Sequence, residues 1–339
     1  MKALVWSAAE EMIWEDRERP IPEDGELLVR IEAVGICGSE IEGYLGHNSL
    51  RKPPLIMGHE FCGIIEQVGN KENDVLIGRK IVVNPLIFCG QCDRCRQGST
   101  QLCESRKIIG IHMPGAFAQW AIVPVAAAIE VPESMNSFRA ALAEPLACSL
   151  RATRRAMDRH AFANVVVMGA GGIGLLCAKI AKLLGASKVM IVDTNPERLK
   201  MCRAIGMEET ANAREDNLEE RTKQTFGSKG IDVVIDAAGF QTTRESAIKL
   251  LNPGGTFMNI GLGIDETVLP INYLIRHEIE LLGSFCYSRQ DFQDAVDLLV
   301  AGRITETGWT EIRSLADGYE AFAQLVAGKV TSGKILMKP

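Results

Sequence analysis

The fold is decided by NVVVMGAGGIG at residues 164–174 and by LLCAKIAKLLGA, which follows at residues 175–186. An unbroken apolar run before a glycine cluster predicts a strand that is buried on both faces. Gly169, Gly171 and Gly174 give the pattern G-x-G-x-x-G, and a helical pattern opens directly after it. A strand, this glycine pattern and a helix in that order predict a βαβ unit that binds a dinucleotide.

The residues of this loop have distinct expected roles. Gly169 permits the tight turn, Gly171 lets the backbone approach a pyrophosphate, and Gly174 lets the helix pack closely on the sheet. Gly172 and Ile173 open the helix, where free N–H groups and the positive end of the helix dipole attract an anion. We therefore expect all five residues to contact the cofactor.

The next predicted strand, KVMIVD at residues 188–193, ends at an acidic residue. Asp193 lies about 20 residues beyond the glycines, where a carboxylate accepts hydrogen bonds from ribose hydroxyls. The same carboxylate would repel the 2′-phosphate of NADP, so we expect NAD, although Arg198 lies nearby. Ala237 and Ile260 stand at later strand ends, at the sheet edge expected to hold the nicotinamide half.

Outward from this unit, the two parts of the chain differ in pattern. From about residue 146, apolar strands alternate with helices, which predicts an α/β fold with a doubly wound parallel sheet. Before it, short β-rich pieces punctuated by Gly and Pro predict a small, irregular β barrel or sandwich. The expected boundaries are 1–145 for the β-rich domain, 146–285 for the nucleotide-binding domain and 286–339 for a segment that returns to the first domain.

Length and charge narrow the class of protein. At about 150 residues per domain, 339 residues predict two domains. A net charge of −6 argues against a nucleic-acid partner, and the absence of Lys/Arg runs argues against an anionic membrane surface. No apolar stretch approaches the roughly 20 residues that span a bilayer. The N-terminus lacks the apolar core of a secretory signal, so we expect a cytoplasmic protein.

Four closely spaced cysteines predict a structural metal site in a lobe at about residues 86–106. Cys89, Cys92, Cys95 and Cys103 form C-x2-C-x2-C-x7-C, a donor set that fits one tetrahedral Zn²⁺ with no open position. An iron–sulfur cluster is the alternative, because it also takes four thiolates. The other cysteines outside the predicted metal sites are expected to be small buried apolar residues: Cys62, Cys148, Cys177, Cys202 and Cys286.

A second, incomplete metal shell is predicted from residues that lie apart in the sequence. Cys37 stands in GICGSE, His59 and Glu60 stand in MGHEFCG, and Glu144 stands in AEPLACSL. A zinc shell with room for water or substrate is the catalytic arrangement. Taken singly, Cys37 could be a buried thiol, His59 a core histidine, and Glu144 the cap of a helix that begins at Pro145.

Together these motifs resemble the zinc-containing medium-chain dehydrogenases. GICGSE, GHE-x2-G-x5-G, the four-cysteine lobe, EPLA and GAGGIG occur in that family's order, and the resemblance runs essentially end to end. It implies a GroES-like catalytic domain, a Rossmann domain, two zinc ions per chain, and a homodimer or homotetramer. Ethanol dehydrogenases place a cysteine ligand at the position of Glu144. A glutamate there resembles the polyol branch of the family, which includes sorbitol, xylitol and galactitol-phosphate dehydrogenases.

The implied chemistry is the oxidation of a secondary alcohol. Zinc held by Cys37 and His59 polarises the substrate oxygen, Ser39 is the first proton acceptor, and hydride passes to the nicotinamide. We expect a polyol or sugar alcohol, free or phosphorylated, as the small-molecule substrate. The alternatives are a threonine-type hydroxy amino acid or a cyclitol. A more remote alternative is a non-catalytic NAD(H)-binding sensor.

The chain departs from the family around its first predicted helix. Many relatives carry a proton-relaying histidine where this chain has Glu42, and His47 is the expected substitute. Arg51 and Lys52 are expected to form a solvated basic pair. Side chains expected from their position to line the substrate cleft are Tyr44, His47, Phe117, His277 and Phe285.

Overall fold

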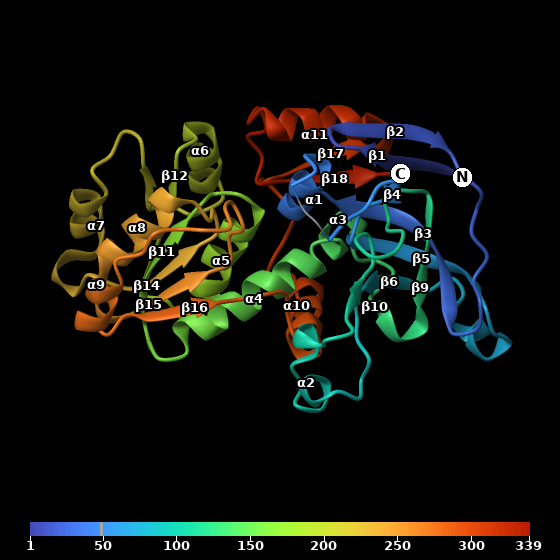
Figure 1. Cartoon of the computed structure of the whole chain (residues 1–339), viewed down its shortest axis with the longest axis horizontal. Coiled ribbons are helices and arrows are strands. Elements are labelled where there is room, and N and C mark those ends of the chain that lie inside the picture. The colour runs from blue at the N-terminus through green and yellow to red at the C-terminus, as the bar shows by residue number, and fades with distance from the viewer. Residues whose placement is uncertain (48–49) are drawn as a thin grey trace. The chain divides into compact units, whose positions relative to one another are not determined.

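The computed structural model describes residues 1–47 and 50–339, and these fold into two compact units (Figure 1). Unit 1 comprises Met1–Pro145, Tyr287–Val330 and Lys334–Pro339. Unit 2 comprises Leu146–Cys286 and Thr331–Gly333. The chain thus leaves unit 1 after Pro145, builds most of unit 2, and returns at Tyr287 to finish the sheet with which it began.

Unit 1 is built on a seven-stranded sheet with the order β10-β6-β5-β3-β18-β17, in which β9 also pairs with β3. Strand β18 pairs in parallel with β17, whereas β3 pairs in antiparallel fashion with β5, β9 and β18. The strands of this sheet are β3 (Glu26–Gly35), β5 (Glu60–Val68), β6 (Lys80–Val83), β9 (Trp120–Pro124), β10 (Ala128–Glu130), β17 (Thr310–Ser314) and β18 (Lys334–Lys338).

Smaller sheets and short helices complete unit 1. One sheet has the order β2-β1-β4, and the other pairs β7 with β8. Their strands are β1 (Lys2–Ala8), β2 (Glu11–Asp16), β4 (Leu55–Ile56), β7 (Leu86–Ile87) and β8 (Lys107–Ile108). The helices are α1 (Gly38–Tyr44), α2 (Asp93–Arg96), α3 (Ser137–Ala140), α10 (Arg289–Val300) and α11 (Gly318–Val326), while α4 (Ala143–Met157) begins in unit 1 and continues into unit 2.

An aromatic cluster lies in the core of unit 1. The ring of Phe322 on α11 lies 5.3 Å from that of Tyr44 at the end of α1, and 5.9 Å from that of Phe117. All three side chains are buried. The expectation that Tyr44 and Phe117 line a substrate cleft is therefore wrong, because both rings fill the core that joins the returning segment to α1.

Unit 2 is a six-stranded, entirely parallel sheet with the order β13-β12-β11-β14-β15-β16 (Figure 1). The strands are β11 (Asn164–Met168), β12 (Lys188–Asp193), β13 (Thr210–Asn212), β14 (Ile231–Asp236), β15 (Leu251–Asn259) and β16 (Glu280–Gly283). The helices are α5 (Gly172–Leu183), α6 (Pro196–Ala204), α7 (Leu218–Phe226), α8 (Gln241–Leu250) and α9 (Ile271–Arg276). The predicted parallel α/β sheet is confirmed.

The central strand of unit 2 explains its continuous apolar sequence. All five residues of β11 are buried, as expected for a strand covered on both faces. The chain runs outward from β11 through β12 to β13, and then returns to β14 on the other side of β11. This reversal creates a topological switch point at the carboxyl ends of β11 and β14, which is where open α/β sheets bind ligands.

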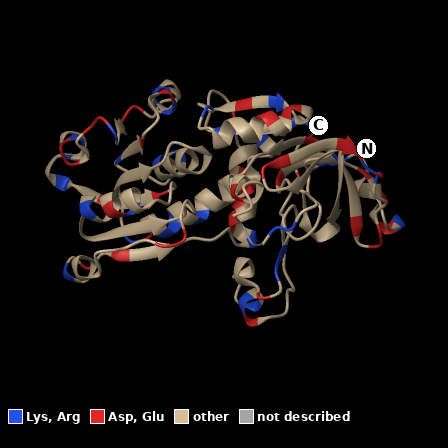
Figure 2. Cartoon of the chain, turned by 45° about the horizontal axis from the view of Figure 1, so that its top comes forward, with Lys and Arg blue, Asp and Glu red and all other residues tan. Residues whose placement is uncertain are grey.

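Acidic and basic residues are interspersed along the ribbon of both units (Figure 2). Among the helices of the described residues, none has the length and apolar character that crossing a membrane requires.

The aromatic cluster yields a stability prediction. Replacing Phe322 by Ala should lower the free energy of unfolding by about 3–5 kcal/mol, because the substitution empties a fully buried ring site. Urea unfolding monitored by circular dichroism measures this change. Tyr319→Ala on the same helix is the matched control, since Tyr319 is largely exposed and should change the free energy by about 0.5 kcal/mol or less. Equal effects of the two substitutions would contradict the assignment of Phe322 to the core.

Candidate functional site

The four predicted cysteine ligands converge in the loop between β7 and β8. Their sulfur atoms all lie within 4.8 Å of one another. The Cys89 and Cys95 Sγ atoms are 3.9 Å apart, and the Cys103 and Cys89 Sγ atoms are 3.6 Å apart. Zinc–sulfur bonds of about 2.3 Å in a tetrahedron place the sulfurs about 3.8 Å apart. The cluster therefore has the dimensions of a shell for one tetrahedral ion.

Backbone donors favour the thiolate form at this cluster. The N–H of Cys92 donates to Cys89 Sγ at 3.4 Å, and the N–H of Cys89 donates to Cys103 Sγ at 3.4 Å. Hydrogen bonds from the N–H groups of Gln91 and Cys92 lower the pKa of the Cys89 thiol to about 6. Because the thiolate is the metal ligand, these backbone donors favour metal binding at Cys89, whereas burial raises the pKa of the Cys95 thiol to about 12.

The second predicted shell is assembled from two loop–element junctions in unit 1. Cys37 directly precedes α1, whereas His59 directly precedes β5 and Glu60 opens that strand. One ligand atom from each of the three lies within 4.8 Å of the others. The antiparallel pairing of β3 with β5 sets Glu60 opposite Gly35, which brings the Cys37 loop next to His59.

The two carboxylate oxygens of Glu60 differ in their contacts. Its Oε2 lies 2.5 Å from the Nζ of Lys334 at the start of β18, and both side chains are buried. Gly35 makes room for this pair, since a Cβ there would lie 2.3 Å from Glu60 Oε2. Glu60 Oε1 is also buried, and it has no hydrogen-bond partner among the described residues. A buried carboxylate oxygen without a donor is a suitable ligand for a cation.

Glu144 belongs to the same charged cluster. It is buried in the first turn of α4, which begins at Ala143 and not at Pro145 as expected for a simple cap. Burial raises the pKa of Glu144 to about 7, the charge of His59 opposes this shift, and the charge of Glu60 adds to it. A carboxyl group with that pKa readily loses its proton when a nearby cation offers charge compensation.

Glu40 is the residue that the sequence analysis missed. Its Oε1 accepts hydrogen bonds from the Gly58 N–H at 2.9 Å and from His59 Nδ1 at 2.8 Å, and its Oε2 accepts from the Cys37 N–H at 3.0 Å. Because Glu40 occupies Nδ1, the Nε2 atom of His59 is the one left for a metal. Glu40 stands three residues after Cys37, where a capping box places an acidic side chain against the start of a helix. This spacing was the feature of the sequence that could have identified it.

The charges around this shell fit a divalent cation. Four acidic groups take part: the Cys37 thiol, Glu40, Glu60 and Glu144. Two buried cations, Arg51 and Lys334, act on this cluster. With every acidic group ionised and His59 neutral, as a metal-binding imidazole must be, two negative charges remain uncompensated, and a dication would neutralise them. Thiolate, imidazole and carboxylate are also the donors that zinc prefers.

Ser39 lies beside the predicted metal ligands. Its Oγ donates to Cys37 Sγ at 3.4 Å. Arg51 donates from one guanidinium nitrogen to the Ser39 carbonyl oxygen at 2.8 Å, and from the other to Ser39 Oγ at 3.1 Å. The expectation of a solvated basic pair is wrong for Arg51, which is 3% exposed, whereas Lys52 is exposed. Glu42 and His47 form an ion pair of 3.4 Å that is largely open to solvent.

The glycine loop of unit 2 has the geometry that its pattern predicts. Gly169 has a φ of 103°, and Gly171 caps α5, of which Gly172 and Ile173 are the first residues. A Cβ on Gly174 would lie 1.9 Å from the Gly169 carbonyl oxygen, so only glycine allows α5 to start this close to β11.

Asp193 supports the same loop at the end of β12. Its Oδ2 accepts from the Ala170 N–H at 2.6 Å, and its Oδ1 accepts from the Asn195 N–H at 2.8 Å. Arg198 lies in the first turn of α6, close to this carboxylate in sequence. Ala237 follows β14, and its N–H donates to the Met168 carbonyl.

The Ile260 N–H donates to the carbonyl of Asp236, the last residue of β14. These contacts place Ala237 and Ile260 at the carboxyl edge of the sheet, near the switch point.

One other expectation needs correction. Cys148 and Cys286 are only partly buried, unlike Cys62, Cys177 and Cys202. His277 stacks on Tyr273, with ring centroids 3.9 Å apart, and its Nδ1 is 3.0 Å from the Tyr273 carbonyl oxygen. These local contacts within α9 account for His277. Phe285 is 39% exposed.

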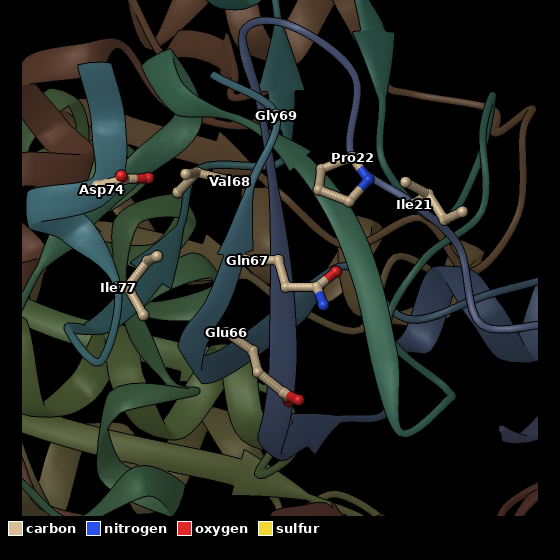
Figure 3. A pocket seen from close by; sticks show the side chains of 8 residues that line it. All are labelled: Ile21, Pro22, Glu66, Gln67, Val68, Gly69, Asp74 and Ile77. Atoms are coloured by element: carbon tan, nitrogen blue, oxygen red, sulfur yellow. The ribbon is translucent and has the colours of Figure 1, made fainter. Parts of the chain in front are cut away.

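A surface hollow of about 280 Å³ lies elsewhere on unit 1 (Figure 3). Its lining includes Glu66, Val68 and Asp74, without a cysteine or histidine. Glu66 is six residues along β5 from Glu60, which corresponds to about 20 Å at 3.3 Å per residue. The hollow is therefore separate from the metal cluster.

Glu40 yields the first site prediction. Replacing Glu40 by Gln should weaken zinc binding at the Cys37–His59 shell by about 10- to 100-fold, because an amide orients the imidazole less well and leaves one negative charge fewer. Metal content after dialysis against graded chelator measures this change. Glu42→Gln on the same helix is the control, since Glu42 is half-exposed and forms an ion pair with His47 away from the predicted ligands. Equal zinc loss in both variants would contradict the role given to Glu40.

The four-cysteine loop yields a second prediction for the site. Cys103→Ala should remove about one zinc per chain and lower the midpoint of thermal unfolding, because a structural zinc site contributes directly to folding free energy. Atomic absorption and calorimetry measure these two changes. Cys202→Ala, at a buried thiol in α6, is the control that should keep the full metal content. Unchanged zinc content in Cys103→Ala would exclude this cluster as a zinc site.

Comparison with known proteins agrees with both units. The family model described as "Alcohol dehydrogenase GroES-like domain" matches residues 23–133, and that described as "Zinc-binding dehydrogenase" matches residues 172–301. L-galactonate-5-dehydrogenase of Escherichia coli (strain K12) is 33% identical to the chain, with 98% of this chain and 99% of that protein covered.

Solved structures show the same fold over the whole chain. A structure from Sinorhizobium meliloti 1021, described as a zinc-binding dehydrogenase bound to NADP, has a TM-score of 0.91 at 30% identity, covering 100% of this chain and 99% of that one. Galactitol-1-phosphate dehydrogenase from Escherichia coli has a TM-score of 0.90 at 25% identity, with 100% of both chains covered. The chain therefore belongs to the zinc-binding alcohol dehydrogenase family and is an oxidoreductase with a GroES-like domain and a Rossmann domain.

Proposed function

We propose that this enzyme oxidises a secondary alcohol of a polyol or sugar-derived substrate, with NAD as the hydride acceptor. The observation that carries the proposal is the shell formed by half-buried Cys37 with buried His59 and Glu60, with the charged Glu144 near it and Ser39 beside it. A fully cysteine-bound ion leaves no position for substrate, whereas this mixed shell does. A non-catalytic sensor would have no use for such a shell.

Each residue of the shell has a proposed task. Cys37 and His59 are proposed as zinc ligands, with a carboxylate of Glu60 or Glu144 as the third, which leaves one position for substrate. Bound zinc supplies Lewis acidity toward the substrate oxygen. Glu40 keeps His59 in the required tautomer. Ser39 accepts the first proton at its Oγ. Cys89, Cys92, Cys95 and Cys103 are proposed to hold the structural zinc.

The cofactor assignment rests on unit 2. We propose that Gly169, Gly171, Gly172, Ile173 and Gly174 surround the pyrophosphate. The hydride acceptor is NAD. The carboxylate of Asp193 would orient it by accepting hydrogen bonds from the ribose hydroxyls. The same carboxylate would repel a 2′-phosphate. Because a 30% identical structure contains NADP, rates with NAD and NADP must be compared directly.

The polyol class is proposed from the site and the relatives together. Glu144 supplies a carboxylate where a simple ethanol dehydrogenase would have a thiolate, and two relatives act on galactonate and on galactitol 1-phosphate by their names. We further propose that the chain works as a cytoplasmic homodimer or homotetramer, a state that light scattering after gel filtration measures.

The decisive experiment is a substrate panel followed by one substitution. Reduction of NAD should appear with polyols, their phosphates or sugar acids, and not with threonine or a cyclitol. Cys37→Ser should then abolish turnover, by roughly 10³-fold or more if the alcohol loses its Lewis acid, while NAD binding, followed by fluorescence or calorimetry, stays unchanged.

The control for this substitution is Cys62→Ala. Cys62 is a buried thiol on β5, two residues beyond Glu60, and it is not among the proposed ligands. It should keep most of the turnover. Full activity in Cys37→Ser would refute the proposed catalytic site. Activity confined to threonine would replace polyols by the hydroxy amino acid class.

A further inference from the structure

Arg51 is a buried guanidinium that makes two hydrogen bonds to one residue. One terminal nitrogen donates to the Ser39 carbonyl oxygen and the other to Ser39 Oγ, at 2.8 and 3.1 Å. Nε is also buried and has no hydrogen-bond partner among the described residues. A planar fork of donors can satisfy a carbonyl and a hydroxyl of one residue together, which a lysine ammonium cannot do with the same geometry.

The fold makes room for this side chain at a specific point of α1. A Cβ on Gly43 would lie 2.7 Å from Arg51 Cδ and 3.4 Å from its Nε. Glycine in a helix interior is destabilising by roughly 1 kcal/mol relative to alanine. Glycine at position 43 therefore makes α1 less stable than alanine would. It leaves the space through which the Arg51 side chain reaches Ser39.

Burial of this cation is unfavourable unless it is compensated. Burial lowers the pKa of Arg51, and the negative charges of Glu40 and Cys37 oppose that shift. Arginine nevertheless stays charged at any physiological pH. A positive charge is thus held permanently beside Ser39, in the cluster that contains the predicted zinc ligands.

We propose that Arg51 is a positioning residue that fixes the Ser39 hydroxyl for catalysis. Because Arg51 donates to Ser39 Oγ, the hydroxyl hydrogen must point elsewhere. In the structure the hydroxyl donates to Cys37 Sγ, with 3.4 Å between the oxygen and the sulfur. One lone pair of Oγ stays available, and a substrate hydroxyl bound at the Cys37–His59 shell would donate to it. Ser39, which is half-buried, would release its own hydroxyl proton to solvent as it accepts the proton of the substrate. Arg51 thereby holds the hydroxyl in the rotamer needed for the reaction before substrate arrives. This inference rests on the proposed function.

The kinetic test is a double-mutant cycle between Arg51 and Ser39. A well-placed proton-transfer group contributes about 10²- to 10⁴-fold to a rate. Arg51→Met should therefore lower kcat on the best polyol by at least roughly 10-fold, with KM changed much less. In the Ser39→Ala background the same substitution should have little further effect, because Arg51 acts through that hydroxyl. Arg51→Lys should restore part of kcat.

Two further variants separate positioning from general damage. Lys52→Met removes the neighbouring exposed cation and should leave kcat unchanged. Gly43→Ala keeps the charge of Arg51 but displaces its side chain, so it should lower kcat as Arg51→Met does without loss of thermal stability. Zinc content and NADH binding should stay at wild-type levels in all variants.

Crystal structures of the zinc-loaded Arg51→Met and Gly43→Ala proteins give a readout independent of turnover. We expect the Ser39 side chain to leave its present rotamer in both. An unmoved Ser39, an unchanged kcat, or full additivity of Arg51→Met with Ser39→Ala would each overturn the role of Arg51. Wild-type protein that oxidises no alcohol would instead refute the proposed function itself.

Discussion

The predicted catalytic shell depends on one carboxylate. Glu40 joins the Cys37 N–H, the Gly58 N–H and the imidazole of His59, so it ties the start of α1 to the start of β5. Burial opposes ionisation of Glu40, but the charge and hydrogen bond of His59 outweigh it and lower its pKa. A buried anion with three donors is well satisfied, which keeps both loops in a single arrangement. The two candidate ligands are thus positioned before any metal binds.

A second constraint closes the site from the end of the chain. Lys334 opens β18, which pairs with β3, and its ammonium meets Glu60 and the Ile36 carbonyl. Burial disfavours the charged lysine, yet Glu60, together with the charges of Cys37 and Glu144, outweighs it and raises the pKa of Lys334. The returning segment therefore completes the electrostatics of a shell whose ligands lie in the first half of the chain. Phe322 joins the same segment to the end of α1 through the apolar core.

The two proposed metal sites differ in how they are built. The four cysteines lie within one short loop, and backbone N–H groups of that loop stabilise their thiolates. The mixed shell draws on β5, β18, α4 and the loop before α1, and it is surrounded by opposite charges. A local site needs only its own loop, which suits a structural ion. A site built from distant elements can leave one position open, because no single loop wraps around the ion.

The sequence by itself determined the parallel sheet, the glycine loop and the two ligand sets. These features depend on periodicity and short-range spacing, which survive without knowledge of long-range packing. Tertiary structure alone decided which side chains serve the site. Glu40 and Arg51 look like surface charges in the sequence but are buried, whereas Tyr44 and Phe117 look like cleft aromatics but fill the core. The reason is physical: burial depends on contacts between residues far apart in the chain, such as Arg51 with Ser39 and Phe322 with Tyr44.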